Sequence, residues 1–299
     1  MSKSTSSTRF VQILRASLAF SVIKKSRKHA DPNSVSCAIS RSGQYYIGGK
    51  IESDTNLLDI SSEQAALLKA VQQNDFDIWK VITLVDDERL PVSPIALKII
   101  VDFGNRVGRI PSYQVIANSG KMIFEASDVS RTLPFYRPVR KRLKLLKRYR
   151  ARNWAEVTAG GKQEVVLKKY ALKGLSHAFP TYEGASSYGA SVLTSNKRIY
   201  FSGQYSAPDK RLNVHAEMAA ITGALMESER SITHLGLVSD KFEREPCAVC
   251  GCCRQFILEL SRKFGWNMII YCFAKNTPTH KIYTIDKLLP YSWSSKKWK

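Results

Sequence analysis

The sequence contains no long hydrophobic run and no recognisable secretion signal. No apolar stretch approaches the roughly 18 to 20 residues that a membrane-spanning helix needs, and none combines a signal-peptide core with a small-residue cleavage site. We therefore expect a soluble protein without a membrane span that is not secreted. The chain has 299 residues, of which 44% are hydrophobic and 24% charged, a composition typical of a globular protein with two domains of average size.

Acidic residues are scarce, with 25 Asp and Glu against 46 Lys and Arg, so the formal net charge is +21. Such an excess favours a polyanionic partner, because a positive surface attracts nucleic acid, acidic protein and anionic membrane alike. The charge does not distinguish among these partners, and it carries no information about catalysis.

Cysteine is also sparse, yet four of the six cysteines lie between Cys247 and Cys253. Cysteines this crowded cannot form separate disulfides across a fold, so they indicate a metal site in a reducing compartment. The first thirty residues lack acids, as transit peptides do. Because the repeat described next places residues 11–20 inside a domain, we expect the cytoplasm, with the mitochondrion and the nucleus as alternatives.

The chain repeats itself at an offset of 154 residues. Residues 36–50 align without a gap on residues 190–204, and Glu63 aligns on Glu217. If the second copy has one additional residue after this point, Pro91 aligns with Pro246. In both copies a helix is followed by two short strands and a second helix, and alternating strands and helices predict an α/β layered fold.

A strongly basic segment separates the two copies. Nine of the sixteen residues from Arg137 to Arg152 are basic, and apolar residues recur among them at helical spacing. This pattern predicts a basic amphipathic helix packed on a domain. Two interpretations stay open, namely a solvated linker helix and an element that binds nucleic acid or another polyanion.

Two short motifs in the second copy carry chemistry. The first is His215-Ala216-Glu217 and the second is the cysteine cluster, and each begins a predicted helix. One imidazole and two thiolates leave the fourth tetrahedral position of zinc open for water, and the carboxylate of Glu217 stands two residues from the imidazole. The alternative is a closed structural zinc site, whose fourth ligand would come from Cys247 or Cys252.

The stretches NVHAEMAAI, CGCCRQFILEL and YTIDKLLPYSW together resemble the cytidine deaminase family. The resemblance covers residues 162–295 and, in degraded form, residues 10–138. It implies two tandem cytidine-deaminase-like domains, each a mixed sheet in an α/β/α layered arrangement. We expect a degenerate domain over residues 1–138, a basic linker helix over 139–161 and a catalytic domain over 162–299.

Two different pairs of cysteines could supply the two thiolate ligands, and we call these two choices registers. The literal Pro-Cys-x-x-Cys places them at Cys247 and Cys250, whereas the family's Arg-Gln pair, which directly follows its second cysteine, places them at Cys250 and Cys253. We prefer the second register, in which Cys247 is a small buried residue or a spare thiol. Arg254 then donates hydrogen bonds to thiolate sulfur, with a surface salt bridge as the alternative.

The resemblance implies hydrolytic deamination in the second copy. Zinc, held by His215, Cys250 and Cys253, lowers the pKa of the water that attacks C4 of cytosine, and Glu217 moves the protons. Members of the family bind the ribose through a Gly-x-Asn-x-Glu motif, but residues 202–207 of this chain contain neither that Asn nor that Glu. Gln204 is the nearest polar substitute, and with Ala216 it is a candidate for substrate binding.

The first copy lacks these ligands. Ser61 stands at the histidine position, and the repeat places Ile95 and Lys98 at the two cysteine positions, so we expect no zinc there. Glu63 keeps the carboxylate position, and we interpret it as a charge on the helix surface. The resemblance implies that this copy is a scaffold that packs as a second subunit would in the family's oligomers, and we expect a homodimer.

Three functions remain open at this point. The first is pyrimidine salvage, in which cytidine and deoxycytidine are converted to uridine and deoxyuridine. The second is deamination of cytosine in RNA or single-stranded DNA, which the basic segment and the altered ribose residues favour. The third is a binding protein that keeps the deaminase shell without turnover.

Overall fold

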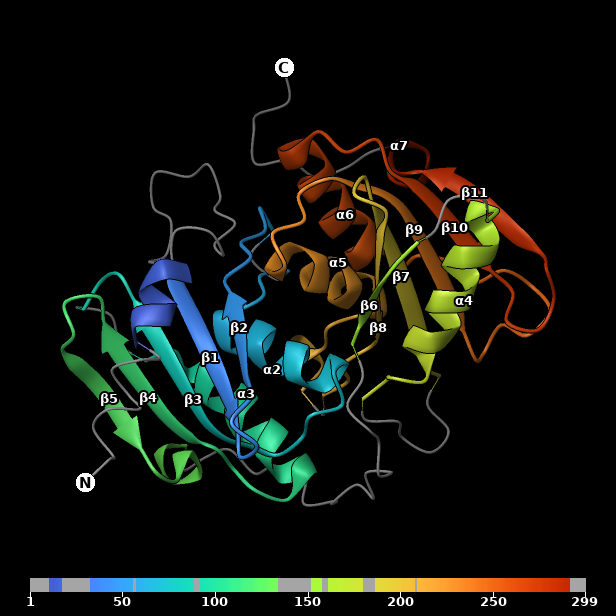
Figure 1. Ribbon diagram of the computed structural model, residues 1–299. Helices are drawn as coiled ribbons and strands as arrows, with labels where there is room; N and C mark the ends of the chain where they lie inside the picture. Colours follow the sequence, from blue (N-terminus) through green and yellow to red (C-terminus); the bar gives the residue numbers. More distant parts are fainter. Residues whose placement is uncertain are drawn as a thin grey trace. The chain divides into compact units, whose positions relative to one another are not determined.

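The structure is a computed structural model, and it describes residues 11–17, 33–55, 58–88, 92–133, 152–157, 161–179, 186–207 and 209–290 (Figure 1). The chain forms two compact units. Unit 1 consists of residues 1–52 and 59–150, and unit 2 consists of residues 53–58 and 151–299.

Unit 1 is built on a five-stranded mixed sheet with the order β2-β1-β3-β4-β5. Only β3 and β4 run parallel, and the other neighbours are antiparallel. Helical residues 11–17 place Leu14 on one face of this sheet, in a cluster with Val35 and Leu84. The elements of unit 1 are β1 (Ser34–Ser40), β2 (Tyr45–Gly49), α2 (Ser62–Gln72), β3 (Ile78–Val85), α3 (Pro94–Val107), β4 (Ser112–Ala117), β5 (Met122–Ala126) and η1 (Val129–Thr132).

Unit 2 has the corresponding strand order with one strand added, β11-β10-β9-β7-β8-β6. Here β9 and β10 are the parallel pair. Its elements are β6 (Trp154–Glu156), α4 (Gln163–Leu175), β7 (Tyr188–Thr194), β8 (Arg198–Gly203), η2 (Lys210–Leu212), α5 (Ala216–Met226), β9 (Ile232–Ser239), α6 (Gly251–Phe264), β10 (Ile269–Phe273), β11 (His280–Thr284) and α7 (Ile285–Leu288).

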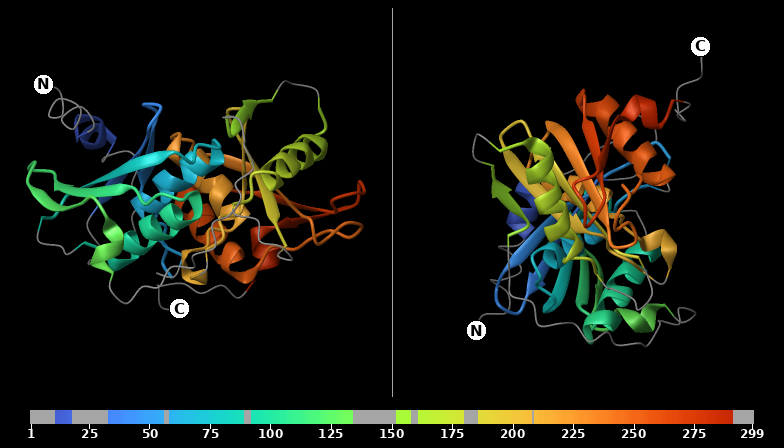
Figure 2. Two further views of the ribbon diagram at one scale, coloured as in Figure 1. Left: turned by 90° about the horizontal axis from the view of Figure 1, so that it is seen from below. Right: turned by 90° about the vertical axis from the view of Figure 1, so that its right-hand side faces the viewer.

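Helices cover both faces of the sheet of unit 2. Figure 1 shows α4 on one side of β7 and β9 and the helices α5 and α6 on the other, and Figure 2 shows the same layers from two further directions. Glycine permits the close approach of α4, because a Cβ atom at Gly189 would lie 2.1 Å from the backbone nitrogen of Leu175. The layered α/β fold predicted from the sequence is confirmed.

The two units share unusual backbone positions at the offset of the sequence repeat. Asn74 and Ser228 both adopt a positive φ, 56° and 64°, directly after α2 and α5. Gly43 and Lys197 do so between the first two strands of each sheet, with φ of 83° and 57°. Non-glycine residues rarely adopt such angles, so two residues that do so at matching positions reflect the same local turn geometry.

The basic segment between the copies lies mostly outside the described residues. The helix predicted for residues 139–161 does not extend over Trp154–Glu156, because these residues form strand β6, antiparallel to β8. The cause is strand pairing at the edge of the sheet: β6 pairs with the edge strand β8, and the ring of Trp154 lies 6.4 Å from the ring of Tyr200 on that strand, tilted by 35°. In the described part of the chain, no helix combines the length and the apolar character needed to cross a bilayer.

Candidate metal and catalytic site

The chemistry-bearing residues of unit 2 lie at the start of two helices on the same face of the sheet. His215 is the N-cap of α5 and Cys250 is the N-cap of α6. Both have extended backbone angles, with ψ of 158° and 162°, and neither side chain caps its own helix. Each side chain therefore remains available to point away from the helix and toward the other.

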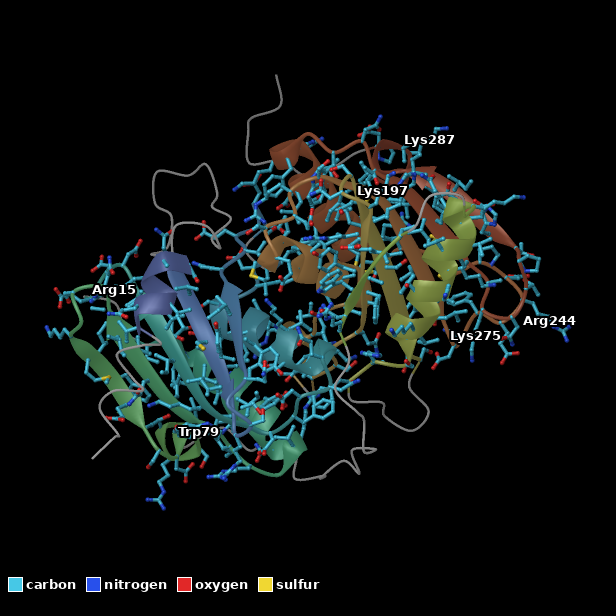
Figure 3. The ribbon with its side chains drawn as sticks, in the orientation of Figure 1. Arg15, Trp79, Lys197, Arg244, Lys275 and Lys287 are labelled. Atoms are coloured by element: carbon cyan, nitrogen blue, oxygen red, sulfur yellow. The ribbon has the colours of Figure 1, made fainter. Side chains whose placement is uncertain are left out.

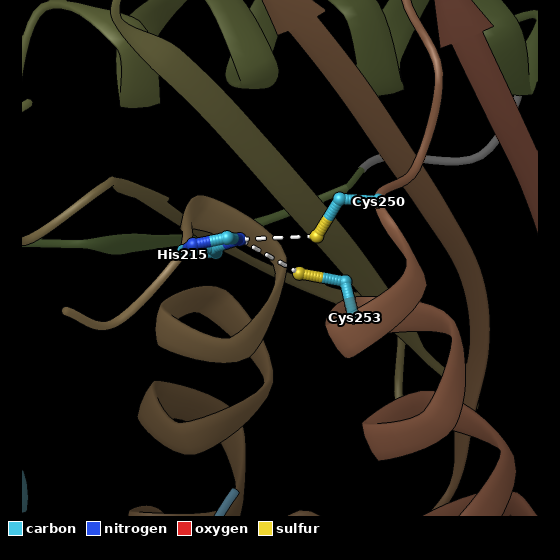
Figure 4. Close-up of side chains that lie close together, drawn as sticks. All are labelled: His215, Cys250 and Cys253. Atoms are coloured by element: carbon cyan, nitrogen blue, oxygen red, sulfur yellow. Dashed lines mark hydrogen bonds between the residues drawn. The ribbon is translucent and has the colours of Figure 1, made fainter. Parts of the chain in front are cut away.

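Three ligand atoms converge at this point (Figure 4). The Nδ1 atom of His215 lies 3.2 Å from the Sγ atom of Cys250 and 3.4 Å from the Sγ atom of Cys253. The three ligand atoms lie within 4.8 Å of one another. Cys253 is buried, whereas His215 and Cys250 keep partial access to solvent.

This donor set suits zinc. One imidazole and two thiolates are ligands that zinc takes in tetrahedral geometry, and three protein ligands leave one position open, as in catalytic sites. Hard cations such as magnesium and calcium require oxygen ligands, which this group does not supply. The geometry and the chemistry of the three residues therefore fit zinc.

The two thiols differ in acidity because they share one hydrogen bond. The hydrogen bond with Cys253 lowers the pKa of Cys250 to about 4, and the hydrogen bond with His215 acts in the same direction. The same hydrogen bond with Cys250 raises the pKa of Cys253, as does its burial. Cys250 is therefore the thiol already poised as a thiolate, and its position at a helix N-terminus favours that charge further.

Glu217 lies in the first turn of α5 and is only 3% exposed. Burial raises its pKa to about 7, and the negative charge of Cys250 adds to this shift. A carboxyl group with this acidity can both accept and release a proton near neutral pH, which a proton carrier requires.

The structure brings together the cysteines of the register that the sequence analysis preferred. Cys247 is absent from the ligand group: it is 2% exposed, and its Sγ atom lies 3.3 Å from the carbonyl oxygen of Leu237. Its thiol therefore takes part in packing behind the site.

Arg254 has partners other than those predicted. Its guanidinium donates to the carbonyl oxygen of Val249 at 2.7 Å and to that of Leu288 at 3.1 Å. It thus makes neither a hydrogen bond to a thiolate nor a salt bridge among the described residues. Because Val249 directly precedes Cys250, Arg254 fixes the loop that presents this ligand and ties it to the end of α7.

In unit 1 the helix that corresponds to α5 is capped in the ordinary way. The hydroxyl of Ser61, the N-cap of α2, accepts a hydrogen bond from the backbone nitrogen of Gln64 at 3.2 Å. A side chain used in this way caps its own helix. In unit 1, a residue that caps its helix therefore occupies the position that His215 has in unit 2.

The cysteine positions predicted in unit 1, Ile95 and Lys98, are wrong. Both α3 and α6 are 14 residues long and end at a left-handed glycine, and their N-caps are Ser93 and Cys250. Ser93 and Ala96 therefore correspond to Cys250 and Cys253. The sequence alignment placed one additional residue in the second copy before this helix, whereas matching the helix ends requires three additional residues. No residue type in the loop indicates the two insertions that the alignment missed.

Glu63 is not on the surface, contrary to the prediction. It is 5% exposed, and its Oε1 atom accepts hydrogen bonds from the hydroxyls of Tyr113 at 2.7 Å and Thr83 at 2.8 Å. A buried carboxylate needs such donors to compensate for lost hydration. This network was not predictable from the sequence, because its members come from three elements that are distant in the chain.

The candidate substrate residues have different environments. Ala216, between His215 and Glu217, is fully buried. Gln204 directly follows β8. Its side-chain amide nitrogen donates hydrogen bonds to the carbonyl oxygen of Ser186 at 3.2 Å and to the hydroxyl of Ser206 at 2.9 Å. The amide nitrogen of Gln204 is therefore already engaged within the loop.

Sequence reasoning missed Tyr188, which begins β7 and pairs with Ser239 at the end of β9. Burial raises the pKa of Tyr188, a hydrogen bond with Ser239 lowers it, and the charges of Cys247, Glu217 and Cys250 raise it. The phenol is thus close enough to the site to feel its charges. A tyrosine at a strand start is too common in sequences to have signalled this.

Several basic side chains of unit 2 project into solvent. Figure 3 shows Lys197, Arg244, Lys275 and Lys287 projecting outward from separate parts of the unit. Arg198 stacks on Trp154 at 5.3 Å from the ring centroid and also forms an ion pair with Glu229 at 3.3 Å.

Residues 162–266 match a family model described as the cytidine and deoxycytidylate deaminase zinc-binding region. The matched stretch contains His215, Glu217, Cys250 and Cys253.

Similar solved structures include cytidine deaminases from three bacteria. The Burkholderia pseudomallei enzyme is 20% identical over 44% of this chain and 100% of its own, with a TM-score of 0.40. The Mycobacterium tuberculosis enzyme is 19% identical over 45% of this chain and 99% of its own, with a TM-score of 0.37. The Mycobacterium leprae enzyme is 18% identical over 44% of this chain and 99% of its own, with a TM-score of 0.35.

Proposed function

We propose that the protein hydrolytically deaminates cytidine and deoxycytidine to uridine and deoxyuridine, because residues 162–266 match the family model of the cytidine and deoxycytidylate deaminase zinc-binding region. The observation that carries the proposal is the convergence of His215, Cys250 and Cys253 with a buried carboxylate, Glu217, two residues from the imidazole. A closed structural zinc site would use a fourth protein ligand and would not need that carboxylate.

The proposed metal ligands are His215, Cys250 and Cys253. When bound, zinc acts as a Lewis acid that lowers the pKa of the attacking water toward neutrality. Arg254 holds the carbonyl oxygen of Val249 and so keeps the Cys250 thiolate in place. Ligands held rigidly in this way need little rearrangement when the metal binds.

Glu217 is the proposed proton carrier. It takes a proton from the attacking water and delivers it to N3 of the cytosine ring. It then takes the proton of the hydroxyl group that was added at C4 and delivers it to the departing amino group, which leaves as ammonia while C4 becomes a carbonyl. Its pKa of about 7 suits both halves of this task, because the group gains and loses a proton at similar cost. Its burial excludes bulk water from the path of these protons.

Unit 1 is proposed to be a metal-free scaffold. This role is supported by the helix cap at Ser61, by Ser93 and Ala96 at the cysteine positions, and by the engagement of Glu63 with Tyr113. We keep the division into a degenerate first domain, a basic linker and a catalytic second domain, the homodimer and a cytoplasmic location as parts of the same proposal, with strand β6 counted in the second domain. A reducing compartment keeps the thiol ligands available for metal.

Turnover by the purified zinc-loaded protein tests the proposal. Cytidine and deoxycytidine should both lose ammonia, at rates that salt changes little, because a small neutral substrate is not steered by charge. Glu217→Gln is the control and should retain zinc without turnover. A protein that holds zinc but deaminates neither nucleoside nor oligonucleotide would be a binding protein, contrary to the proposal.

A second candidate is deamination of cytosine in RNA or single-stranded DNA. It is favoured by the formal charge of +21 and by the basic side chains that project from unit 2. In that case oligonucleotides should be deaminated and free nucleosides should not, and the rate should fall steeply between 50 and 200 mM salt as phosphate contacts weaken. The same assay, with both substrate classes at two salt concentrations, separates the two candidates.

A further inference from the structure

Unit 2 contains a short segment from the first copy of the sequence, Ser53–Leu58, of which the structure describes residues 53–55 and 58. On either side of this segment, Ile51 and Ile60 exchange two backbone hydrogen bonds of 2.9 Å, and both side chains are buried. The segment is therefore a loop whose two ends are held together. Such a loop loses less conformational entropy on packing than a free chain of the same length does.

One carboxylate of α6 binds this segment. The Oε2 atom of Glu259 accepts hydrogen bonds from the hydroxyl of Ser53 at 2.5 Å and from the backbone nitrogen of Asp54 at 2.6 Å. The Ser53 hydroxyl gives its single proton to the carboxylate, so the hydroxyl of Thr55, 2.9 Å away, is the donor in their contact. Hydrogen bonds to a carboxylate are shorter and stronger than those between neutral groups, and Glu259 therefore attaches the segment firmly.

The other oxygen of the same carboxylate connects it to the beginning of α6. The Oε1 atom of Glu259 accepts a hydrogen bond at 2.7 Å from the side-chain amide of Gln255, one helical turn earlier. Gln255 directly follows Arg254, whose guanidinium holds the carbonyl oxygen of Val249. Two neighbouring side chains thus fix the first turns of α6, one through the loop before the helix and the other through segment 53–58.

Zinc binding depends on the position of α6. The imidazole of His215 stands at the start of α5, whereas Cys250 and Cys253 both belong to the start of α6, and the two helices pack on each other. A shift or rotation of α6 moves both sulfur atoms together relative to the imidazole. Because a metal site tolerates deviations of only about 0.2 Å in ligand distance, a contact that holds α6 acts on metal affinity without touching the metal.

The repeat identifies the counterpart of this segment in the second copy. At the offset of 154, residues 53–58 correspond to residues 207–212, which lead to the ligand His215. In the first copy the same path leads to Ser61, which caps its own helix. The loop of the first copy thus presents no metal ligand, and it binds α6 instead.

We propose that Glu259 is a positioning residue, which binds segment 53–58 and thereby holds α6, with Cys250 and Cys253, in the geometry that takes up zinc. The first copy then supplies a part of the unit that binds the metal. The inference rests on the proposed deaminase function and its metal site, and it assigns a role to a residue outside the ligand group.

Glu259→Ala in the full-length protein tests the inference. Zinc affinity, measured by competition with a chelator, should fall about 10-fold, the lower end of the range for residues that support metal ligands. Peptides that cover residues 53–58 should also exchange their amide hydrogens faster. Glu259→Gln should stay near the wild type in both measurements, because its carbonyl oxygen can accept both hydrogen bonds once the amide of Gln255 turns over. Glu243→Ala, which removes an exposed acid of unit 2, is the matched control and should change neither value.

A double-mutant cycle separates binding of the segment from a general effect on the helix. Ser53→Ala should weaken zinc binding about 2- to 5-fold in the wild-type background, because it removes one of the two hydrogen bonds, and should have no effect when residue 259 is already alanine. Additive losses would mean that Glu259 acts on α6 without the segment. Unchanged zinc affinity in Glu259→Ala, or a loss in Glu259→Gln as large as in Glu259→Ala, would also overturn the inference.

The inference and the proposed function fail in different ways. A wild-type protein that binds no zinc, or binds zinc and deaminates no substrate, refutes the proposed function. A wild-type protein that binds zinc and deaminates cytidine, and whose zinc affinity is the same in Glu259→Ala, refutes the positioning role alone.

Discussion

Replacing Glu63 with alanine should destabilise unit 1, because the buried carboxylate accepts hydrogen bonds from buried hydroxyls, the shortest from Tyr113 and Thr83. The hydroxyl of Thr83 can turn to Ser36, whose Oγ atom lies 2.7 Å away, so the main loss falls on Tyr113, which is 1% exposed. An unsatisfied buried hydroxyl costs about 1–3 kcal/mol, and the space left by the side chain adds about 1 kcal/mol, for a total of about 2–4 kcal/mol.

Hydrogen exchange read at the level of peptides measures this effect where it arises, because a protein with two units need not unfold in one step. Amides of α2 and β4 should lose protection, and those of α5 and α6 should not. Adding Tyr113→Phe to Glu63→Ala should recover part of the loss, since removing both partners leaves no unsatisfied donor. Unchanged protection in Glu63→Ala, or no recovery in the double variant, would refute the structural role of this network.

Three further predictions concern the site of unit 2. Glu217→Gln should lower the rate of deamination by about 100- to 10,000-fold while the bound zinc stays constant, measured by ammonia release and metal analysis; equal activity would exclude it as the proton carrier. Cys247→Ala should bind as much zinc as the wild type, and a loss of zinc would favour the other cysteine register. Arg254→Ala should weaken zinc binding about 10- to 100-fold in a chelator competition, because the loop before Cys250 is then held less firmly; unchanged affinity would contradict its positioning role.

Local motifs made the ligand group predictable. His215 with Glu217, and Cys250 with Cys253, have spacings that the chemistry requires within single turns of helix, so the sequence alone could name residues whose ligand atoms the structure brings within 4.8 Å. The layered fold was predictable for the same reason, since hydrophobic periods of strands and helices are local properties.

Contacts between distant segments were not predictable. The partners of Arg254 include the carbonyl oxygen of Leu288, and those of Glu63 include Tyr113, fifty positions away in the sequence. A charged side chain in a sequence does not reveal whether tertiary structure buries it. The misplaced cysteine positions in unit 1 have a related cause, because insertions in a loop leave no trace in the residue types on either side.

The most direct test of the account is the zinc content of the folded, purified protein. Elemental analysis should find one zinc per chain in the wild type and none in His215→Ala or Cys250→Ala, with unit 1 contributing no metal. Zinc that persists in both variants, or a wild type without tightly bound zinc, would contradict the central claim that His215, Cys250 and Cys253 form the metal site.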